Sequence, residues 1–212
     1  MPGIDYKKEY KDLYAPKTTP MQILVPPMTF ITVGGAGDPN AEGGAYQGAV
    51  GLLYALSYTV KMSKMGGSAP EGYFDYVIPP LEGLWWMAGG FQGVDYTRKS
   101  DFCWISMIRQ PEFVTKEVFS WACDEARKKK GVDPSSAKLE TLDEGLCVQC
   151  MHIGPFDDEP ATVAKIEAFI RENGLKNDIN DVRHHHEIYL GDPRKTDPKK
   201  MKTVLRIPVK KA

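Results

Sequence analysis

The residues best placed to do chemistry lie in the segment 185–190, which reads His-His-Glu-Ile-Tyr-Leu. Its alternation predicts an extended strand with Ile188 and Leu190 on one face and His185, Glu187 and Tyr189 on the other. If the apolar face packs against helices, Glu187 faces a cleft. A carboxylate among aromatic side chains is poorly solvated, which suits a base or a counter-ion for a cationic ligand. The equally weighted alternative is an exposed Glu187 paired with Lys or Arg.

A second group of residues could provide an aromatic wall. Tyr73 leads into the segment 81–86, Leu-Glu-Gly-Leu-Trp-Trp, and Trp104 lies on the following strand. Neighbouring residues of a strand point to opposite faces, so one of Trp85 and Trp86 enters the core and the other enters the cleft. Aromatic walls with a few polar groups suit a flat, apolar ligand. Glu82 either joins Glu187 as a second carboxylate or is exposed at a turn.

Three other patterns do not predict a cofactor or metal site. The glycine-rich loop 34–44 lacks a phosphate-binding signature and is better explained as a turn before a helix. Cys147 and Cys150, three residues apart on a strand, point to opposite faces and cannot hold one ion. His184 and His186 share a face and could chelate a metal, but they fit better as the polar end of a core face. We therefore predict neither metal nor cofactor.

Composition limits the class of protein. The chain has 212 residues, 26% of them charged, with a net charge of −1. This balance argues against nucleic-acid binding as the main role. No apolar run is long enough to span a bilayer, and the first twenty residues lack a secretory apolar region. Four cysteines in a chain of this length do not indicate a disulfide scaffold. We expect a soluble, reduced, cytoplasmic protein, with its oligomeric state left open.

Periodicity predicts a lead-in segment, residues 1–27, followed by two similar halves of one domain, about 28–111 and 112–212. Each half reads strand, helix, strand, strand, and a linking helix precedes the second. The fold class expected is α+β: a duplicated unit with two antiparallel sheets, helices on one face and a central ligand cleft. The expected strands are 28–33, 73–87, 102–110, 138–153, 184–190 and 202–209, and the expected helices are 45–62, 115–130 and 160–173.

Several motifs in this order resemble a known family. The segments 139–145 (Leu-Glu-Thr-Leu-Asp-Glu-Gly), 152–156 (His-Ile-Gly-Pro-Phe) and 186–193 (His-Glu-Ile-Tyr-Leu-Gly-Asp-Pro) resemble the GyrI-like small-molecule-binding domain. In the first half, Gly-Ala-Gly-Asp-Pro-Asn at 35–40 and Pro-Leu-Glu-Gly-Leu-Trp-Trp at 80–86, together with Leu53-Tyr54 and Tyr58, resemble its standalone branch. The resemblance covers nearly the whole chain.

The resemblance implies a function as well as a duplicated fold with a central cleft. In effector-binding relatives, a Glu at the position of Glu187 meets bulky, often cationic aromatic drugs. Some standalone relatives are implied to be hydrolases that open the cyclopropane ring of DNA-alkylating cyclopropanoids of the yatakemycin and duocarmycin class. Where the family pattern often has Tyr after Gly-Pro, this chain has Phe156, so one hydroxyl is absent. The lead-in is too short and too proline-rich for a helix-turn-helix.

Two functions from different classes follow. The first is a detoxifying cyclopropanoid hydrolase in which Glu187 activates a water and a polar donor, from among Tyr189, His185, Tyr73 and Tyr54, stabilises the developing oxyanion. The second is a non-catalytic binder or sensor of aromatic, possibly cationic, drugs. A role in binding a protein partner through basic patches is the third reading. The residues predicted to contact the small aromatic ligand, besides the catalytic pair Glu187 and Tyr189, are Trp86, Trp104, Tyr73, Phe156, Glu82, Trp85 and His185.

Overall fold

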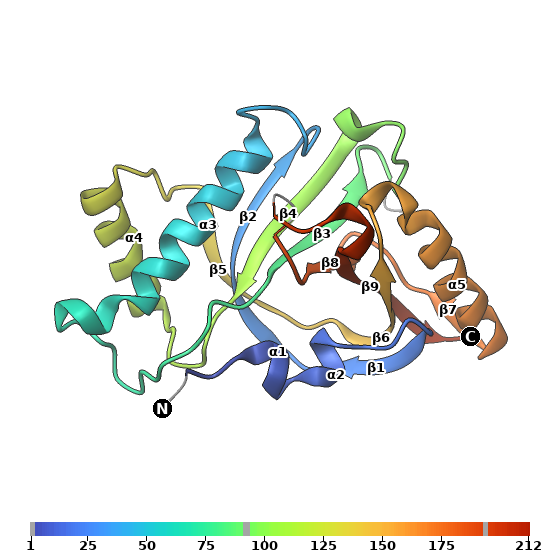
Figure 1. Cartoon of the computed structure of the whole chain (residues 1–212), viewed down its shortest axis with the longest axis horizontal. Helices are drawn as coiled ribbons and strands as arrows, with labels where there is room; N and C mark the ends of the chain where they lie inside the picture. Colours follow the sequence, from blue (N-terminus) through green and yellow to red (C-terminus); the bar gives the residue numbers. More distant parts are fainter. Residues whose placement is uncertain (1–2, 91–93, 193–194) are drawn as a thin grey trace.

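In the computed structural model, which describes residues 3–90, 94–192 and 195–212, nine strands form an antiparallel sheet (Figure 1). Eight follow the order β1-β6-β9-β8-β3-β4-β2-β5, and β7 pairs with β9. The strands are β1 (Met21–Val25), β2 (Met28–Ala36), β3 (Leu81–Met87), β4 (Phe102–Arg109), β5 (Ala137–Leu142), β6 (Gly145–Ile153), β7 (Leu175–Asn177), β8 (His185–Tyr189) and β9 (Lys202–Lys211).

Three long helices and several short ones accompany the sheet. The long helices match the predicted ranges to within one residue at each end, because their apolar residues repeat at three- and four-residue spacing. The Thr115 side chain caps α4, and Gly131, with φ of +66°, ends it. The α-helices are α1 (Tyr6–Glu9), α2 (Lys11–Tyr14), α3 (Ala45–Lys61), α4 (Lys116–Lys130) and α5 (Glu159–Glu172), and the 3-10 turns are η1 (Ser63–Gly66), η2 (Lys99–Asp101), η3 (Phe156–Asp158) and η4 (Pro198–Lys200). No helix in the described ranges combines the length and the apolar character needed to cross a bilayer.

The predicted α+β duplication is confirmed. One unit is β2-α3-β3-β4 and the other is β6-α5-β8-β9, and their strands mirror each other in the sheet as β2-β4-β3 and β8-β9-β6. The two sheets expected to be separate are instead continuous. Strands β3 and β8 pair from Leu81 opposite Tyr189 to Trp85 opposite His185, which joins the halves edge to edge.

Two expected strands differ from the observed ones. The strand expected over 138–153 is two strands, because the chain turns at Gly145, with φ of +59°, so that β5 pairs with β2 while β6 pairs with β9. In the same way β1 pairs with β6 rather than with β2, so β1 joins the sheet beside the second unit and β5 joins it beside the first. The strand expected to begin at Tyr73 begins at Leu81, because Pro79 and Pro80 cannot donate hydrogen bonds to a neighbouring strand.

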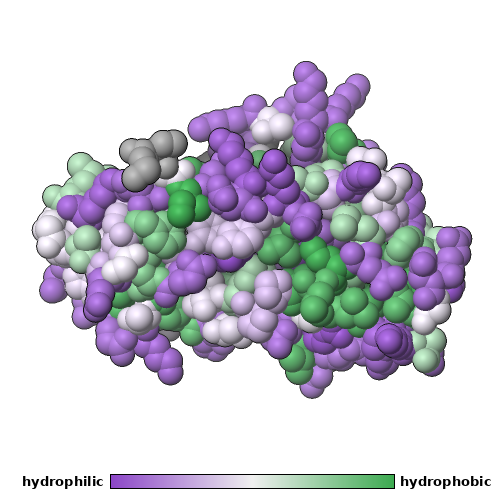
Figure 2. Space-filling model, turned by 90° about the horizontal axis from the view of Figure 1, so that it is seen from below, coloured by the Kyte–Doolittle hydropathy of each residue, from purple (hydrophilic) through white to green (hydrophobic). Residues whose placement is uncertain are grey.

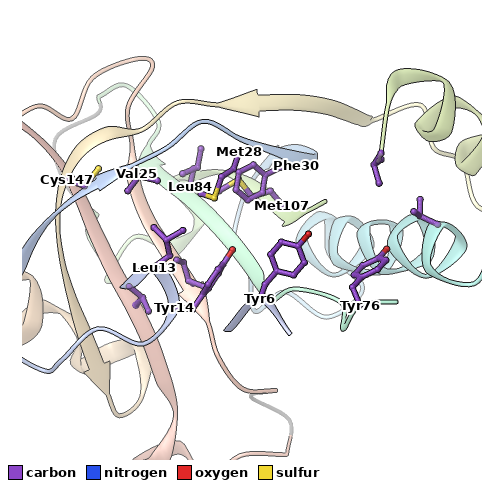
Figure 3. Packing of buried hydrophobic residues seen from close by; sticks show 14 of the residues in the cluster. Tyr6, Leu13, Tyr14, Val25, Met28, Phe30, Tyr76, Leu84, Met107 and Cys147 are labelled. Atoms are coloured by element: carbon purple, nitrogen blue, oxygen red, sulfur yellow. The ribbon is translucent and has the colours of Figure 1, made fainter. Parts of the chain in front are cut away.

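The two faces of the sheet are covered differently. Helices α3 and α5 lie over one face, and α4 packs against α3. The N-terminal segment covers the other face, where Tyr6, Leu13 and Tyr14 are buried against residues such as Leu84 and Met107 (Figure 3). Seen from the side on which α1, α2 and β1 lie, apolar side chains gather in one area among polar ones (Figure 2).

A buried charge cluster lies under α1 and α2. Nε2 of His186 is 2.9 Å from Oε2 of Glu82, and its Nδ1 is 2.9 Å from Oε1 of Glu144. Arg206 donates to Glu144 over 2.8 Å and also to Gln149. Burial disfavours the charged imidazole, yet the Glu144 carboxylate raises the pKa of His186 to about 9. Burial likewise opposes ionisation of Glu144, but His186 and Arg206 lower its pKa to about 2. Mutual neutralisation is what permits these charges to be buried.

The charge cluster predicts how the free energy of unfolding depends on pH. The pKa of His186 is raised in the folded state, so its contribution is complete below pH about 6.5 and is lost as the pH rises through 9. The contribution of Glu144 to the free energy of unfolding is complete above pH about 4.5 and is lost as the pH falls through 2, because its pKa is lowered in the folded state. Urea unfolding followed by circular dichroism should therefore give a lower midpoint at pH 9.5 than at pH 6.

The control for this prediction is His186→Gln. The variant should be less stable at pH 6 by about 3–5 kcal/mol, because Glu82 loses its buried partner. Its urea midpoint should change much less between pH 6 and pH 9.5. Equal midpoints for the wild-type protein at these two pH values would contradict a charged His186.

Candidate functional site

Glu187 lies at the centre of the sheet, on the face that α3 and α5 cover. It sits opposite Gly83 of β3 and Leu205 of β9, and the residue is 6% exposed. The expectation that Ile188 faces the helices is wrong: Ile188 packs with Leu13, Tyr14 and Leu84 on the opposite face. Alternation along β8 then turns Glu187 toward the helix side. The carboxylate is thus buried rather than exposed beside a surface cation.

Glu187 is held by polar groups of its own strand. The Tyr189 hydroxyl donates to Oε2 of Glu187 over 2.8 Å, and it accepts a 2.8 Å hydrogen bond from Nε1 of Trp85. Nε2 of His185 lies 3.3 Å from Oε1 of Glu187. Burial, and then the Glu187 charge, raise the pKa of Tyr189 well above its usual value. Tyr189 therefore acts as a hydrogen-bond donor that keeps its proton.

A second buried carboxyl group, that of Glu159, accompanies Glu187. Glu159 is the first residue of α5 and is fully buried, and Oε2 accepts a 3.0 Å hydrogen bond from the Tyr96 hydroxyl. Burial, and then the Glu187 carboxylate, raise the pKa of Glu159 well above its usual value. Two neighbouring buried carboxyl groups cannot both be ionised cheaply, so Glu159 retains a proton at a pH where ordinary glutamates have lost theirs.

Glu159 is the functional residue that sequence reasoning missed. A glutamate in the first turn of a helix is common because it favours the positive end of the helix dipole, so its position gave no signal. Its distance of 28 residues from Glu187 hid the pairing as well. Tyr96, which lies in the loop after β3, was missed because it too is far from Glu187 in the sequence. The phrase Gly-Pro-Phe at 154–156, just before Glu159, was the one available hint.

Aromatic rings surround the carboxyl pair. The Tyr46 ring of α3 lies 5.4 Å from that of Trp85 and 5.2 Å, edge-on, from that of Trp104. The Phe156 ring lies 5.7 Å, edge-on, from that of Tyr189. Burial, and then the Glu187 charge, raise the pKa of Tyr46 to about 12, so this phenol also stays neutral. The surroundings of Glu187 are therefore largely aromatic, apart from Glu159 and His185.

The structure brings together most of the predicted site residues. Around Glu187 it places Tyr189, Trp85, Trp104, Phe156 and His185. Three others lie elsewhere. Glu82 faces away, toward His186. Trp86 also points to that opposite face, where its ring stacks on His184 at 4.3 Å. Tyr73 donates its hydroxyl to the carbonyl of Lys61, with its ring against Phe113. Between the two tryptophans, Trp85 is the one beside Glu187.

Glycines make room for the rings. A Cβ on Gly83 would lie 2.6 Å from Nε1 of Trp85 and 3.1 Å from the Tyr189 hydroxyl oxygen. A Cβ on Gly35 would lie 2.3 Å from Cη2 of Trp104. Real Cβ atoms do not approach so closely, so both strand positions require glycine for the aromatic side chains to lie flat on the sheet.

A groove of about 530 Å³ runs beside α5 and comes within one residue of the carboxyl pair; we call it the α5 groove. Tyr96 and His185 line it and also contact Glu159 and Glu187. The lining residues are Val94, Tyr96, Pro160, Val163, Ala164, Glu167, Asn177, Ile179, His185 and Ile207. Within the described ranges, no three His, Cys, Asp or Glu side chains are grouped to hold a metal ion. The arrangement instead offers two buried carboxyl groups, of which Glu159 has a raised pKa, beside an open groove.

Comparisons with known proteins give a consistent picture. The family model described as the GyrI-like small-molecule-binding domain matches residues 18–210. A crystal structure of a hydrolase from Listeria innocua is 51% identical, with a TM-score of 0.89 over 98% of this chain and 100% of its own. An uncharacterised conserved protein from Listeria innocua is 53% identical, with a TM-score of 0.91 over the same shares. No curated protein sequence matches the chain.

A more distant structure shares the fold alone. The C-terminal domain of EcmrR is 12% identical, with a TM-score of 0.56 over 92% of this chain and 98% of its own.

Substituting Gly83 tests the packing of the site. Gly83→Ala should displace the Trp85 indole from Tyr189 and lower stability by about 1–3 kcal/mol, because the added methyl group overfills the space. Gly34→Ala, whose Cβ would have its nearest neighbour at 3.8 Å, is the matched control on β2. Urea unfolding should separate the two variants, and near-ultraviolet circular dichroism should change only for Gly83→Ala. Identical unfolding curves would contradict the crowded position of Gly83.

Proposed function

The chain belongs to the GyrI-like small-molecule-binding domain family, and we propose that it is a hydrolase that opens the cyclopropane ring of cyclopropanoid DNA-alkylating compounds of the yatakemycin and duocarmycin class. The observation that supports this function best is the buried pair of Glu187 and Glu159, in which burial and the Glu187 carboxylate raise the pKa of Glu159. The 51% identity with a Listeria innocua hydrolase over nearly the whole chain supports hydrolysis as the class of reaction. The resulting role is detoxification.

The proposed reaction adds one water. Glu187 accepts a proton from a water molecule while the water oxygen bonds to the unsubstituted carbon of the cyclopropane. The ring carbon–carbon bond breaks, and its electron pair moves through the conjugated system to the carbonyl oxygen, which becomes a phenol when it takes up a proton. Relief of ring strain and gain of aromaticity drive the step, so one well-placed base contributes a large part of the catalysis.

Glu159 is the proposed donor of that proton. Its raised pKa keeps it protonated. Tyr189 is the poorer acid because its own pKa is raised and its proton is directed to Glu187. Phe156 has no hydroxyl to offer. The two carboxyl groups thus take opposite parts, as in enzymes that use one glutamate as an acid and a second carboxylate in its ionised form.

The aromatic surroundings are proposed to bind and orient the flat substrate. Trp85 and Trp104 are buried, and the partly exposed Tyr46 ring packs against both, so Tyr46 offers the surface against which a planar ring system can stack. Exclusion of bulk water there strengthens hydrogen bonds to the developing oxyanion.

The alternative is a non-catalytic binder of aromatic cations, in which Glu187 is a counter-ion. The absence of lysine and arginine from the described lining of the α5 groove favours cations over anions. The two functions differ in what happens to the ligand. A binder leaves a cationic dye unchanged and loses affinity for it in Glu187→Gln, whereas a hydrolase consumes a neutral, strained electrophile.

Mass spectrometry of a duocarmycin-class cyclopropanoid after incubation with the protein tests the proposal. The wild-type protein should produce a species heavier by one water. In Glu187→Gln, kcat/KM should fall by roughly 10²–10⁴-fold because the base is removed. Glu172→Gln, an exposed substitution at the other end of α5, is the control and should keep the wild-type rate. Turnover at an undiminished rate by Glu187→Gln would show that Glu187 is not the base.

The pH profile tests Glu159 separately. Because Glu159 must hold a proton to donate it, kcat should decline as the pH rises through its raised pKa, well above the range of an ordinary glutamate. Glu159→Gln should lower kcat at every pH and remove this alkaline decline. The measurement is kcat between pH 5 and pH 10 for both proteins. An unchanged alkaline limb in Glu159→Gln would assign the proton donor to another residue.

A further inference from the structure

The α5 groove extends the site beyond the two carboxyl groups. Tyr96 and His185 belong both to the groove lining and to the surroundings of Glu159 and Glu187. The His185 side chain is buried, and its Nε2 lies 3.3 Å from Oε1 of Glu187. A ligand whose reactive part reaches Glu187 from this side therefore has its remaining part in the groove.

The groove is longer than a single ring. Its α5 wall consists of Pro160, Val163, Ala164 and Glu167, which repeat at three- and four-residue spacing and so form one stripe of the helix. Seven residues of helix rise by about 10 Å. The volume of about 530 Å³ lies within the range of small-molecule sites, roughly 300–1,000 Å³.

The chemistry of the lining changes along the groove. Val163 and Ala164 from α5, with Ile179 and Ile207 opposite, make the middle apolar. Glu167, two helical turns from Glu159, ends the stripe and is exposed. Among the described lining residues it is the one carboxylate, and none of them is a lysine or arginine. The far end therefore favours a positively charged or N–H-donating group.

We propose that the α5 groove is the specificity subsite of the protein: it selects elongated aromatic ligands whose non-reacting end carries a cationic or N–H-donating group that meets Glu167. The proposal rests on the proposed function for the position of the reacting end, but not for the binding itself. Ala164 is a specificity-determining residue in this assignment because its small side chain keeps the apolar middle of the groove open.

Filling the groove tests the proposal without any turnover. The probes are acridine, a compact tricyclic, and quinacrine, an acridine that carries a cationic aminoalkyl tail; both are followed by fluorescence anisotropy. Ala164→Trp should raise the Kd of quinacrine at least tenfold, because the indole occupies the middle of the groove, and should leave that of acridine within about twofold. Ala164 is exposed, so the variant should fold. The control is Lys165→Trp, on the adjoining face of α5 and outside the lining, which should leave both Kd values unchanged.

Glu167→Gln tests the far end. It should weaken quinacrine binding by about fivefold at low salt, and by less at high salt, because the tail loses a solvent-exposed ion pair. Acridine binding should not change. Equal weakening of both probes by Ala164→Trp, or no binding of quinacrine by the wild-type protein, would overturn the subsite.

The same variants separate this proposal from the proposed hydrolysis. With a cyclopropanoid substrate, Ala164→Trp should raise KM for a molecule with an extended tail and leave kcat unchanged, because the groove contacts only the non-reacting part. Selective loss of quinacrine binding, without any conversion of cyclopropanoids by the wild-type protein, would remove the hydrolase function and keep the subsite. Conversion of cyclopropanoids by Ala164→Trp with an unaltered KM would keep the hydrolase function and remove the subsite.

Discussion

The pairing of β3 with β8 is the contact on which the rest of the molecule depends. It joins the two repeats into one sheet, and its register places Gly83 opposite Glu187 and Trp85 opposite His185. In that register the missing side chain of Gly83 leaves the space in which the Trp85 indole reaches the Tyr189 hydroxyl. A slip of one residue would send every side chain of β8 to the wrong face.

The same register builds two different electrostatic environments on either side of one strand. His186 points toward Glu82 and Glu144, where charges of opposite sign neutralise one another. Its neighbour Glu187 points toward Glu159, another acid, and the surroundings are aromatic. The first arrangement stabilises fixed charges; in the second, burial and the Glu187 carboxylate raise the pKa of Glu159. Buried opposite charges suit a structural role, whereas buried like charges suit proton transfer.

The two faces of the sheet differ in what covers each. On one side the N-terminal segment brings Tyr6, Leu13 and Tyr14 into the core and closes it. On the other, α3 and α5 cover the two halves of the sheet, with β3 and β8 between them. Strands β1 and β5 lie at the two ends of the strand order, β1 against β6 and β5 against β2, so the central strands are flanked on both sides.

Local patterns in the sequence determined much of this protein. The helical spacing defined α3, α4 and α5, the order of elements indicated the duplication, and the period-two alternation put His185, Glu187 and Tyr189 on one face of one strand. These features depend on neighbours along the chain, where backbone geometry sets which side chains share a face. Trp85 and Trp86 were correctly assigned to opposite faces for the same reason.

The tertiary structure decided which face of each strand meets the helices and which distant residues meet at the site. The Ile188 side chain can pack equally well against a helix or against the N-terminal segment. The sequence around it therefore could not show that Glu187 faces α3 and α5. The register of β3 against β8 turned Glu82 away from Glu187, and the packing of α5 brought Glu159 toward it. Strand register and helix placement are set by the summed burial of residues far apart in the chain, which no local period records.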